Sequence, residues 1–117
     1  VYLLESRGSY SLRTADVLNN LRSQDESFIT SVITITEFLA GTEAPGPEAL
    51  QQVSNLRFLD MDEACAVQAA LLQRETKLHI SDAIHLATAV KYRSDLLFTN
   101  DKQLATVAKK YLPVKTL

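Results

Sequence analysis

A chain of 117 residues, of which 46% are hydrophobic and 22% charged, has the size and composition of one soluble globular domain. Its 12 Lys and Arg residues against 14 Asp and Glu leave a net charge of -2. This balance neither requires nor excludes a nucleic-acid partner, because a local basic patch matters more than the total. No apolar run approaches the roughly 20 residues of a membrane span, and the single cysteine, Cys65, excludes an internal disulfide or a zinc knuckle. We therefore expect a cytoplasmic protein with no membrane partner.

The first half of the chain predicts two helices, a strand and two further helices. Apolar residues at 1–4, and along one side of the segment that contains Val17, Leu18 and Leu21, indicate the first two helices. Residues 27–31, SFITS, have the β-branched and aromatic content of a strand. The helix that follows lies in SVITITEFLAG, at 31–41, and a Gly- and Pro-rich loop at 41–49 separates it from the next expected helix.

In the second half, strands are expected at 56–59, 95–99 and 113–116. Spacings of i, i+3, i+4 and i+7 indicate three helices between them, and their stripes are Val67, Ala70, Leu71 and Arg74; Ala83, Leu86, Ala87 and Val90; and Leu104, Val107, Ala108 and Tyr111. Strands that alternate with helices predict an α/β fold, with a parallel sheet covered on both faces. Ligands of such sheets bind beyond the carboxyl ends of the strands.

Three carboxylates stand near such ends or open a helix. Glu37 lies about two turns into an apolar helix after the first expected strand, Asp101 follows the strand at 95–99, and Asp82 opens a helix within HISDAIHL. Singly, each has an ordinary explanation: Glu37 on a narrow solvated stripe, Asp101 as a helix cap, and Ser81 or Asp82 as another cap. If the three converge, their mutual repulsion calls for a cation, and oxygen ligands suit Mg²⁺ or Mn²⁺.

The segments SVITITEFLAG, KLHISDAIHLATAV and DLLFTNDKQL, with the ending LPVKTL, resemble in order and spacing the PIN-domain family and in particular its VapC-type toxins. The resemblance runs from Val1 to Leu117, a single PIN-like domain. It implies a three-layer α/β/α fold and a ribonuclease that depends on Mg²⁺ or Mn²⁺, pairs with a small antitoxin and forms a homodimer. It also implies that Glu37, Asp82 and Asp101 are catalytic metal ligands, because they match the family's second, third and fourth acidic positions.

The start of the chain departs from this family. In the family, a strand ending in an aspartate, then Ser or Thr, comes immediately before the segment that VYLLESRGSY resembles. The central first strand and the first acidic ligand are therefore expected to be missing from this chain. We expect either that residues upstream of Val1 exist in the natural protein, or that the chain closes the gap by rearrangement or with a partner's segment.

The chemistry that the resemblance implies is hydrolysis of an RNA phosphodiester bond by water at a metal held by the three acids. Thr99 and Lys102 would contact the substrate, and Lys102 is the basic residue of most interest because it adjoins Asp101. His85 lies three residues after Asp82 on the same helix face. Of its two interpretations, a general base and a packed or hydrogen-bonded residue, the second is favoured.

Two other classes of function stay open at this point. Without the first acid, the chain also fits a catalytically inactive PIN-like remnant that binds an antitoxin or dimerises. A phospho-receiver-like signalling domain shares the parallel sheet and the acidic pocket, although only Lys115 matches its other requirements, and loosely. Metal-dependent cleavage of RNA separates the ribonuclease from both alternatives.

Overall fold

The protein is built around a sheet of short strands. The computed structural model describes residues 2–4, 28–40 and 56–116, which form five strands and four helices. The strands are β1 (Tyr2–Leu4), β2 (Phe28–Ser31), β3 (Leu56–Leu59), β4 (Leu96–Phe98) and β5 (Val114–Lys115). The helices are α2 (Ile33–Leu39), α3 (Glu63–Thr76), α4 (Ile80–Lys91) and α5 (Lys102–Ala108).

All strand pairs are parallel, and the strands follow the order β3-β2-β1-β4-β5 across the sheet. The α/β class is confirmed, as are the strands expected from 27 onward, each trimmed by at most one residue at either end. The helix expected within 31–41 and the three later helices are also present. The helix expected around residues 17–21, the loop at 41–49 and the helix expected after that loop lie outside the described residues.

The centre of the sheet differs from the sequence expectation. The sequence predicts a helix near residues 1–4 and a missing central strand, but the structure places β1 between β2 and β4. Tyr2 is in register with both Phe28 and Leu96, and Leu4 is in register with Phe98. Three apolar residues are too few for periodicity to separate a strand from a helix. Pairing with two strands that come later in the chain decides the outcome.

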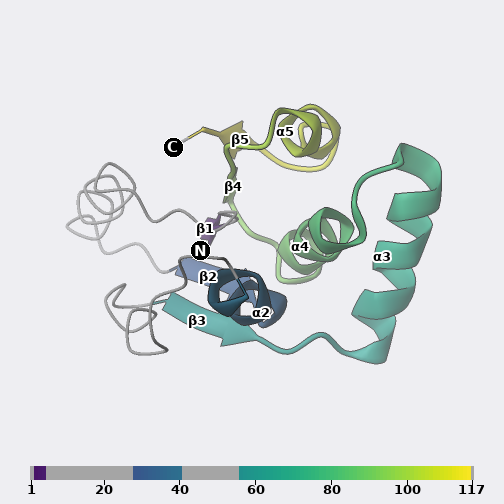
Figure 1. Cartoon of the computed structure of the whole chain (residues 1–117). Coiled ribbons are helices and arrows are strands. Elements are labelled where there is room, and N and C mark those ends of the chain that lie inside the picture. The colour runs from purple at the N-terminus through teal and green to yellow at the C-terminus, as the bar shows by residue number, and fades with distance from the viewer. Residues whose placement is uncertain (1, 5–27, 41–55, 117) are drawn as a thin grey trace.

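The helices that follow β3 and β4 lie together on one side of the sheet (Figure 1). α4 lies next to the sheet, and its fully buried Ala83 and Leu86 join a core that includes Leu97 of β4 and Leu104 of α5. Burial of one such leucine contributes about 1.5–3 kcal/mol, so this core holds the helical layer on the sheet. None of the helices in the described residues is long and apolar enough to cross a membrane.

α3 lies beyond α4, at the outer edge of the molecule (Figure 1). It buries Cys65, Ala69 and Leu72. The stripe that indicates this helix in the sequence faces the other way, because Val67 is 55% and Leu71 50% exposed. Helical periodicity therefore identifies the helix correctly, while its contact with α4 uses a different face.

Candidate functional site

The carboxyl ends of three neighbouring strands define one edge of the sheet. β1 lies between β2 and β4, and all three run in the same direction. α2 begins two residues after the end of β2 and carries Glu37, and Asp101 follows the end of β4 by three residues. Parallel α/β sheets bind ligands at this edge, so two of the three candidate acids belong to segments that start there.

Glu37 is bound by a buried histidine. His85 Nε2 donates a hydrogen bond to Glu37 Oε1 at 2.8 Å. His85 is 1% exposed, whereas the Glu37 side chain is 25% exposed. Glu37 is therefore more than a member of a solvated stripe, because its carboxylate is tied to the interior while part of it stays accessible to solvent. The contact joins α2 to α4.

Asp82 lies in the first turn of α4 and is 1% exposed. The sequence predicts a cap at Ser81 or Asp82, but the helix begins at Ile80 and its N-cap is His79, which makes no side-chain cap hydrogen bond. The predicted capping role is therefore wrong, because the N-cap position falls at His79, two residues before Ser81 and three before Asp82. The dipole of α4 still stabilises a negative charge in its first turn, and a buried carboxylate needs such compensation.

One face of α4 brings two of the candidate acids into the same region. Asp82 and His85 are three residues apart, a spacing that places side chains on the same helix face. Because His85 also binds Glu37, the Asp82 face of α4 adjoins α2. The structure thus connects Glu37 and Asp82 through one helix face, although they are far apart in the sequence.

Asp101 is the N-cap of α5, as the sequence predicts. Its Oδ1 accepts a hydrogen bond from the Leu104 N–H at 2.8 Å, and its own N–H donates to Thr99 Oγ1 at 3.0 Å. Thr99 is fully buried, so its hydroxyl shapes the turn between β4 and α5 from the inside. Lys102, the first residue of α5, is exposed.

Buried hydroxyl groups line the end of β2, and they were not among the site residues predicted from the sequence. Thr30 Oγ1 and Thr34 Oγ1 share a hydrogen bond of 2.7 Å, and both side chains are buried. Ser31 Oγ accepts a hydrogen bond from the Ile33 N–H at 3.3 Å. Ser and Thr between a strand and a helix often bind the backbone in this way, and that pattern was the available signal. These residues fix the start of α2 and so the position of Glu37.

A sequence model of the PIN domain matches residues 2–110 of the chain. The chain belongs to the PIN domain family. The match spans the four described helices and the strands β1 to β4, including β1 at the centre of the sheet. PIN domains are generally nucleases.

Solved structures share the fold of this PIN domain. VapBC2 from Rickettsia felis, in a crystal structure bound to a DNA fragment from its promoter, has a TM-score of 0.70 and 17% identity, over 98% of this chain and 97% of that chain. A toxin-antitoxin complex from Klebsiella pneumoniae has a TM-score of 0.64 and 23% identity, over 90% of this chain and 91% of that chain. A comparison with curated proteins returns no match.

The candidate acids of this PIN domain have the donor chemistry of a Mg²⁺ or Mn²⁺ site. Both ions prefer oxygen ligands, and Glu37, Asp82 and Asp101 offer carboxylates. In the part of the chain that the structure describes, no three His, Cys, Asp or Glu side chains come close enough to hold a metal ion. The three acids therefore have the right ligand atoms for the metal. A complete ligand set in this PIN domain needs a further acid, or a closer approach of the three carboxylates to one another.

Glu5 is a further acid that was not among the ligands predicted from the sequence. In the sequence it directly follows Leu4, the last residue of β1. Glu5 itself lies outside the described residues. The signal was the pair Glu5 and Ser6 after a short apolar run, which matches the expected aspartate and Ser or Thr except for a longer acid. Assigning residues 1–4 to a helix hid this signal.

Proposed function

We propose that this PIN domain is a metal-dependent endoribonuclease and the toxin of a toxin-antitoxin pair. One observation carries the proposal: the almost fully buried Asp82 shares a face of α4 with His85, whose ring binds the partly exposed Glu37. A buried carboxylate is costly for stability alone. Such groups gather at functional sites, and membership of a family of nucleases supports the same interpretation.

In this proposal, Glu37, Asp82 and Asp101 hold Mg²⁺ or Mn²⁺, with Glu5 as the fourth acid. A bound ion of this kind polarises a phosphate oxygen and lowers the pKa of a water molecule. The residues of the chain supply the orientation: His85 fixes one oxygen of Glu37, and the cap hydrogen bond fixes one oxygen of Asp101.

In this proposal, the RNA substrate meets an exposed basic residue beside Asp101. Lys102 follows Asp101 and is exposed, so we propose that it binds a backbone phosphate. Thr99 acts on substrate binding through the turn that it holds, because its buried hydroxyl accepts the Asp101 N–H. Binding through phosphate contacts weakens steeply as the salt concentration rises.

The proposed partners are a small antitoxin protein and a second copy of this chain. The structures from Rickettsia felis and Klebsiella pneumoniae support the antitoxin, because the second is described as a toxin-antitoxin complex and the first as VapBC2. We place the protein in the cytoplasm, where its proposed RNA substrate is found.

The experiment is a cleavage assay on RNA with Mg²⁺ or Mn²⁺. We expect cleavage by the wild type, its loss with EDTA and its recovery when Mg²⁺ or Mn²⁺ is added back. Asp82→Asn keeps the size of the side chain but removes its charge, so we expect cleavage to fall at least about hundredfold. The melting temperature should stay close to that of the wild type, because the substitution removes a buried charge without leaving a cavity.

The matched control is Asp95→Asn. Asp95 is exposed and precedes β4, at the opposite end of the strand from Asp101, so this variant should cleave like the wild type. Unchanged cleavage in Asp82→Asn would contradict the site. A folded wild type that cleaves no RNA with either metal, and still binds an antitoxin, would favour the inactive PIN-like module.

A further inference from the structure

The outer face of α5 carries basic side chains from one end of the helix to the other. Lys102, Thr106 and Lys109 follow a spacing of i, i+4 and i+7, so they lie along one line of the helix. All three are exposed, and so is Lys110, which follows the last residue of the helix by two positions. The opposite side of α5 is buried through Leu104, Ala105 and Ala108. We call the exposed line, together with Lys110, the α5 face.

The charge of the α5 face runs against the balance of the whole chain. Residues 102–116 contain four lysines and no Asp or Glu, whereas the chain as a whole has 12 Lys and Arg residues against 14 Asp and Glu. No ion pair between described residues involves a lysine of the α5 face. The helix dipole favours cations at the C-terminal end of α5, but it disfavours Lys102 in the first turn. Helix stability therefore does not account for the whole face.

The α5 face starts beside a candidate metal ligand. Asp101 is the N-cap of α5 and directly precedes Lys102. From there the face leads away from the carboxyl edge of the sheet, because α5 returns the chain to the start of β5, where Val114 is in parallel register with Leu97 of β4. An anionic chain that reaches the acids therefore meets cations along this helix.

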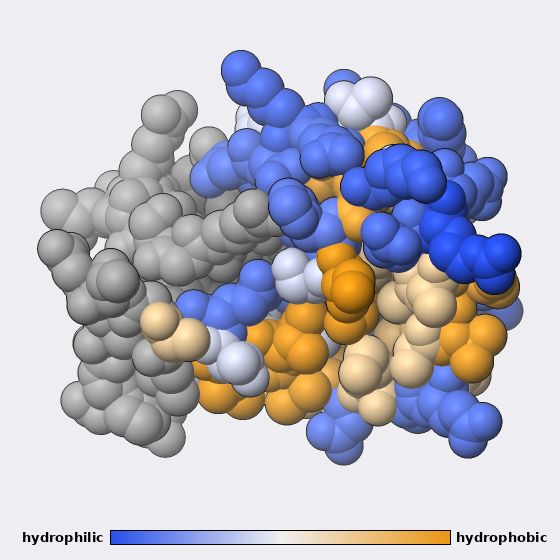
Figure 2. All heavy atoms as spheres, turned by 45° about the vertical axis from the view of Figure 1, so that its right-hand side comes forward, coloured by the Kyte–Doolittle hydropathy of each residue, from blue (hydrophilic) through white to orange (hydrophobic). Residues whose placement is uncertain are grey.

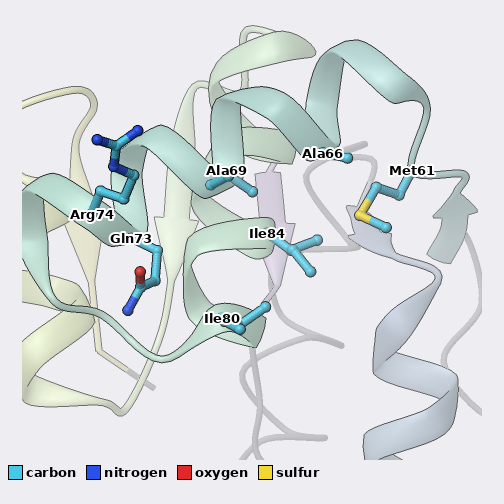
Figure 3. A pocket seen from close by; sticks show the side chains of 8 residues that line it. Met61, Ala66, Ala69, Gln73, Arg74, Ile80 and Ile84 are labelled. Carbon is cyan, nitrogen blue, oxygen red and sulfur yellow. The ribbon is translucent and has the colours of Figure 1, made fainter.

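The α5 face differs in character from the surface of α3 and α4. Figure 2 shows hydrophilic side chains gathered over the upper part of the molecule, where Figure 1 places α5. A hollow of about 340 Å³ between α3 and α4 is mainly apolar, with walls that include Met61, Ile80 and Ile84. Arg74 is the one cation among the described residues that line it (Figure 3). Binding of a phosphate chain depends on several cations, so the α5 face suits it better than the hollow.

We propose that the α5 face binds the backbone of a single-stranded stretch of RNA that extends from the cleavage site. At about 1.5 Å per residue, Lys102 and Lys109 are separated by about 10 Å along the helix axis. In a stacked strand, phosphates recur about every 3.4 Å along the axis, so the face matches about three nucleotides. This inference rests on the proposed ribonuclease, because it assigns a path to the substrate of that enzyme.

An aromatic side chain at the end of the α5 face favours a single strand over a duplex. Tyr111 directly follows Lys110 and is 43% exposed. Proteins that hold single-stranded nucleic acid combine a basic track with aromatic rings on which the bases stack. The bases of a duplex are already stacked on one another, so a duplex would meet the face through its backbone alone.

The test is a titration of a fluorescently labelled single-stranded RNA in EDTA, which measures binding without cleavage, at several salt concentrations. For a single strand, each phosphate contact adds about 0.7 to the steepness with which log K falls against log salt. We expect Lys109→Gln to lower the affinity about threefold to tenfold and the steepness by about 0.7. Lys109→Gln combined with Lys110→Gln should lower the steepness by about 1.4. Tyr111→Leu should weaken binding about tenfold and leave the steepness unchanged.

The matched control is Arg57→Gln, which removes one positive charge from an exposed position in β3. β3 and β5 form the two opposite edges of the sheet, and α5 lies beside β5 (Figure 1). This variant has the same net charge as Lys109→Gln, and we expect it to bind the RNA like the wild type, with the same dependence on salt.

Lysine variants that bind RNA with the affinity and steepness of the wild type would overturn the inference, and the α5 face would then belong to an acidic protein segment. An equal loss in Arg57→Gln would also overturn it. A duplex that binds as tightly as the single strand would contradict the single-stranded path. The cleavage assay is run on the same samples. The expected binding pattern in protein that cleaves no RNA contradicts only the nuclease, whereas normal cleavage with unchanged binding in the lysine variants contradicts only the α5 face.

Discussion

At the scale of single residues, the buried His85 links α4 to α2 through its hydrogen bond to Glu37. At His85 the sequence favours a packed or hydrogen-bonded residue over a general base, and the structure shows a ring that is 1% exposed and bound to Glu37. The cap at Asp101 was predictable in the same way, because capping is decided within four residues. The cap near Asp82 was not, because α4 starts at Ile80, ahead of Ser81, with His79 as an N-cap that makes no side-chain hydrogen bond.

We predict that His85 acts as a positioning residue for Glu37 in metal binding. His85→Phe keeps a ring but removes the donor, so metal-dependent cleavage should fall about tenfold to hundredfold, as for other groups that orient a metal ligand. The concentration of Mn²⁺ that gives half-maximal cleavage should rise with it. His85→Gln keeps an N–H donor and should recover most of the loss. Equal cleavage by the Phe variant and the wild type would show that the histidine only fills space.

At the scale of the elements, a charged contact ties the start of α3 to the end of α4. Lys91 Nζ donates a hydrogen bond to Asp62 Oδ2, and Asp62 Oδ1 caps α3 by accepting the Cys65 N–H at 2.8 Å. The bond from Lys91, followed by that from Cys65, lowers the pKa of Asp62 below 3.8. The same bond raises the pKa of Lys91 above 10.5. Both side chains are accessible to solvent, so salt weakens the contact.

This contact predicts a loss of stability in acid. A carboxylate whose pKa is lower in the folded chain stabilises it fully above the unfolded value of 3.8, and the contribution disappears as the pH falls through the folded pKa. Asp62→Asn keeps a capping oxygen but removes the charge. We expect the wild type to melt above this variant at about pH 6, and the difference to vanish near about pH 2.

The control for this prediction is Asp62→Ala, which also removes the cap and should melt below the Asn variant at both pH values. High salt should reduce the difference between wild type and Asp62→Asn at the higher pH. A difference in melting temperature that does not change with pH would show that the charge of Asp62 contributes nothing.

At the scale of the whole molecule, the position of β1 decides whether the site can form. β1 lies between β2 and β4. β2 leads into α2, which carries Glu37, and β4 leads into Asp101, the N-cap of α5. Among the described strands, only β1 has two such neighbours. A sheet without it would separate β2 from β4, and Glu37 from Asp101. The three carboxyl ends meet because a segment at the start of the chain pairs with strands that begin at residues 28 and 96.

We predict that proline is not tolerated at the centre of β1. Each N–H of a central strand points to one of its two neighbours, so Leu3→Pro removes a ladder hydrogen bond and should lower the free energy of unfolding by about 1–3 kcal/mol. The measurement is the urea midpoint. Val114→Pro is the control in the edge strand β5. Pro113 and Lys115 accept the bonds from β4, so the Val114 N–H points away from the sheet. Equal midpoints for Leu3→Pro and the wild type would contradict a central β1.

For the described residues, the sequence by itself determined the class of fold and the type and place of the elements from residue 28 onward, because hydrophobic period and strand composition are properties of a few neighbouring residues. The tertiary structure alone decided four further features. It made Tyr2–Leu4 a strand, turned the Val67 and Leu71 stripe of α3 outward, buried Asp82 and bound His85 to Glu37. Each of these depends on which distant segment supplies the partner, and that choice follows from the packing of the whole chain rather than from any local pattern.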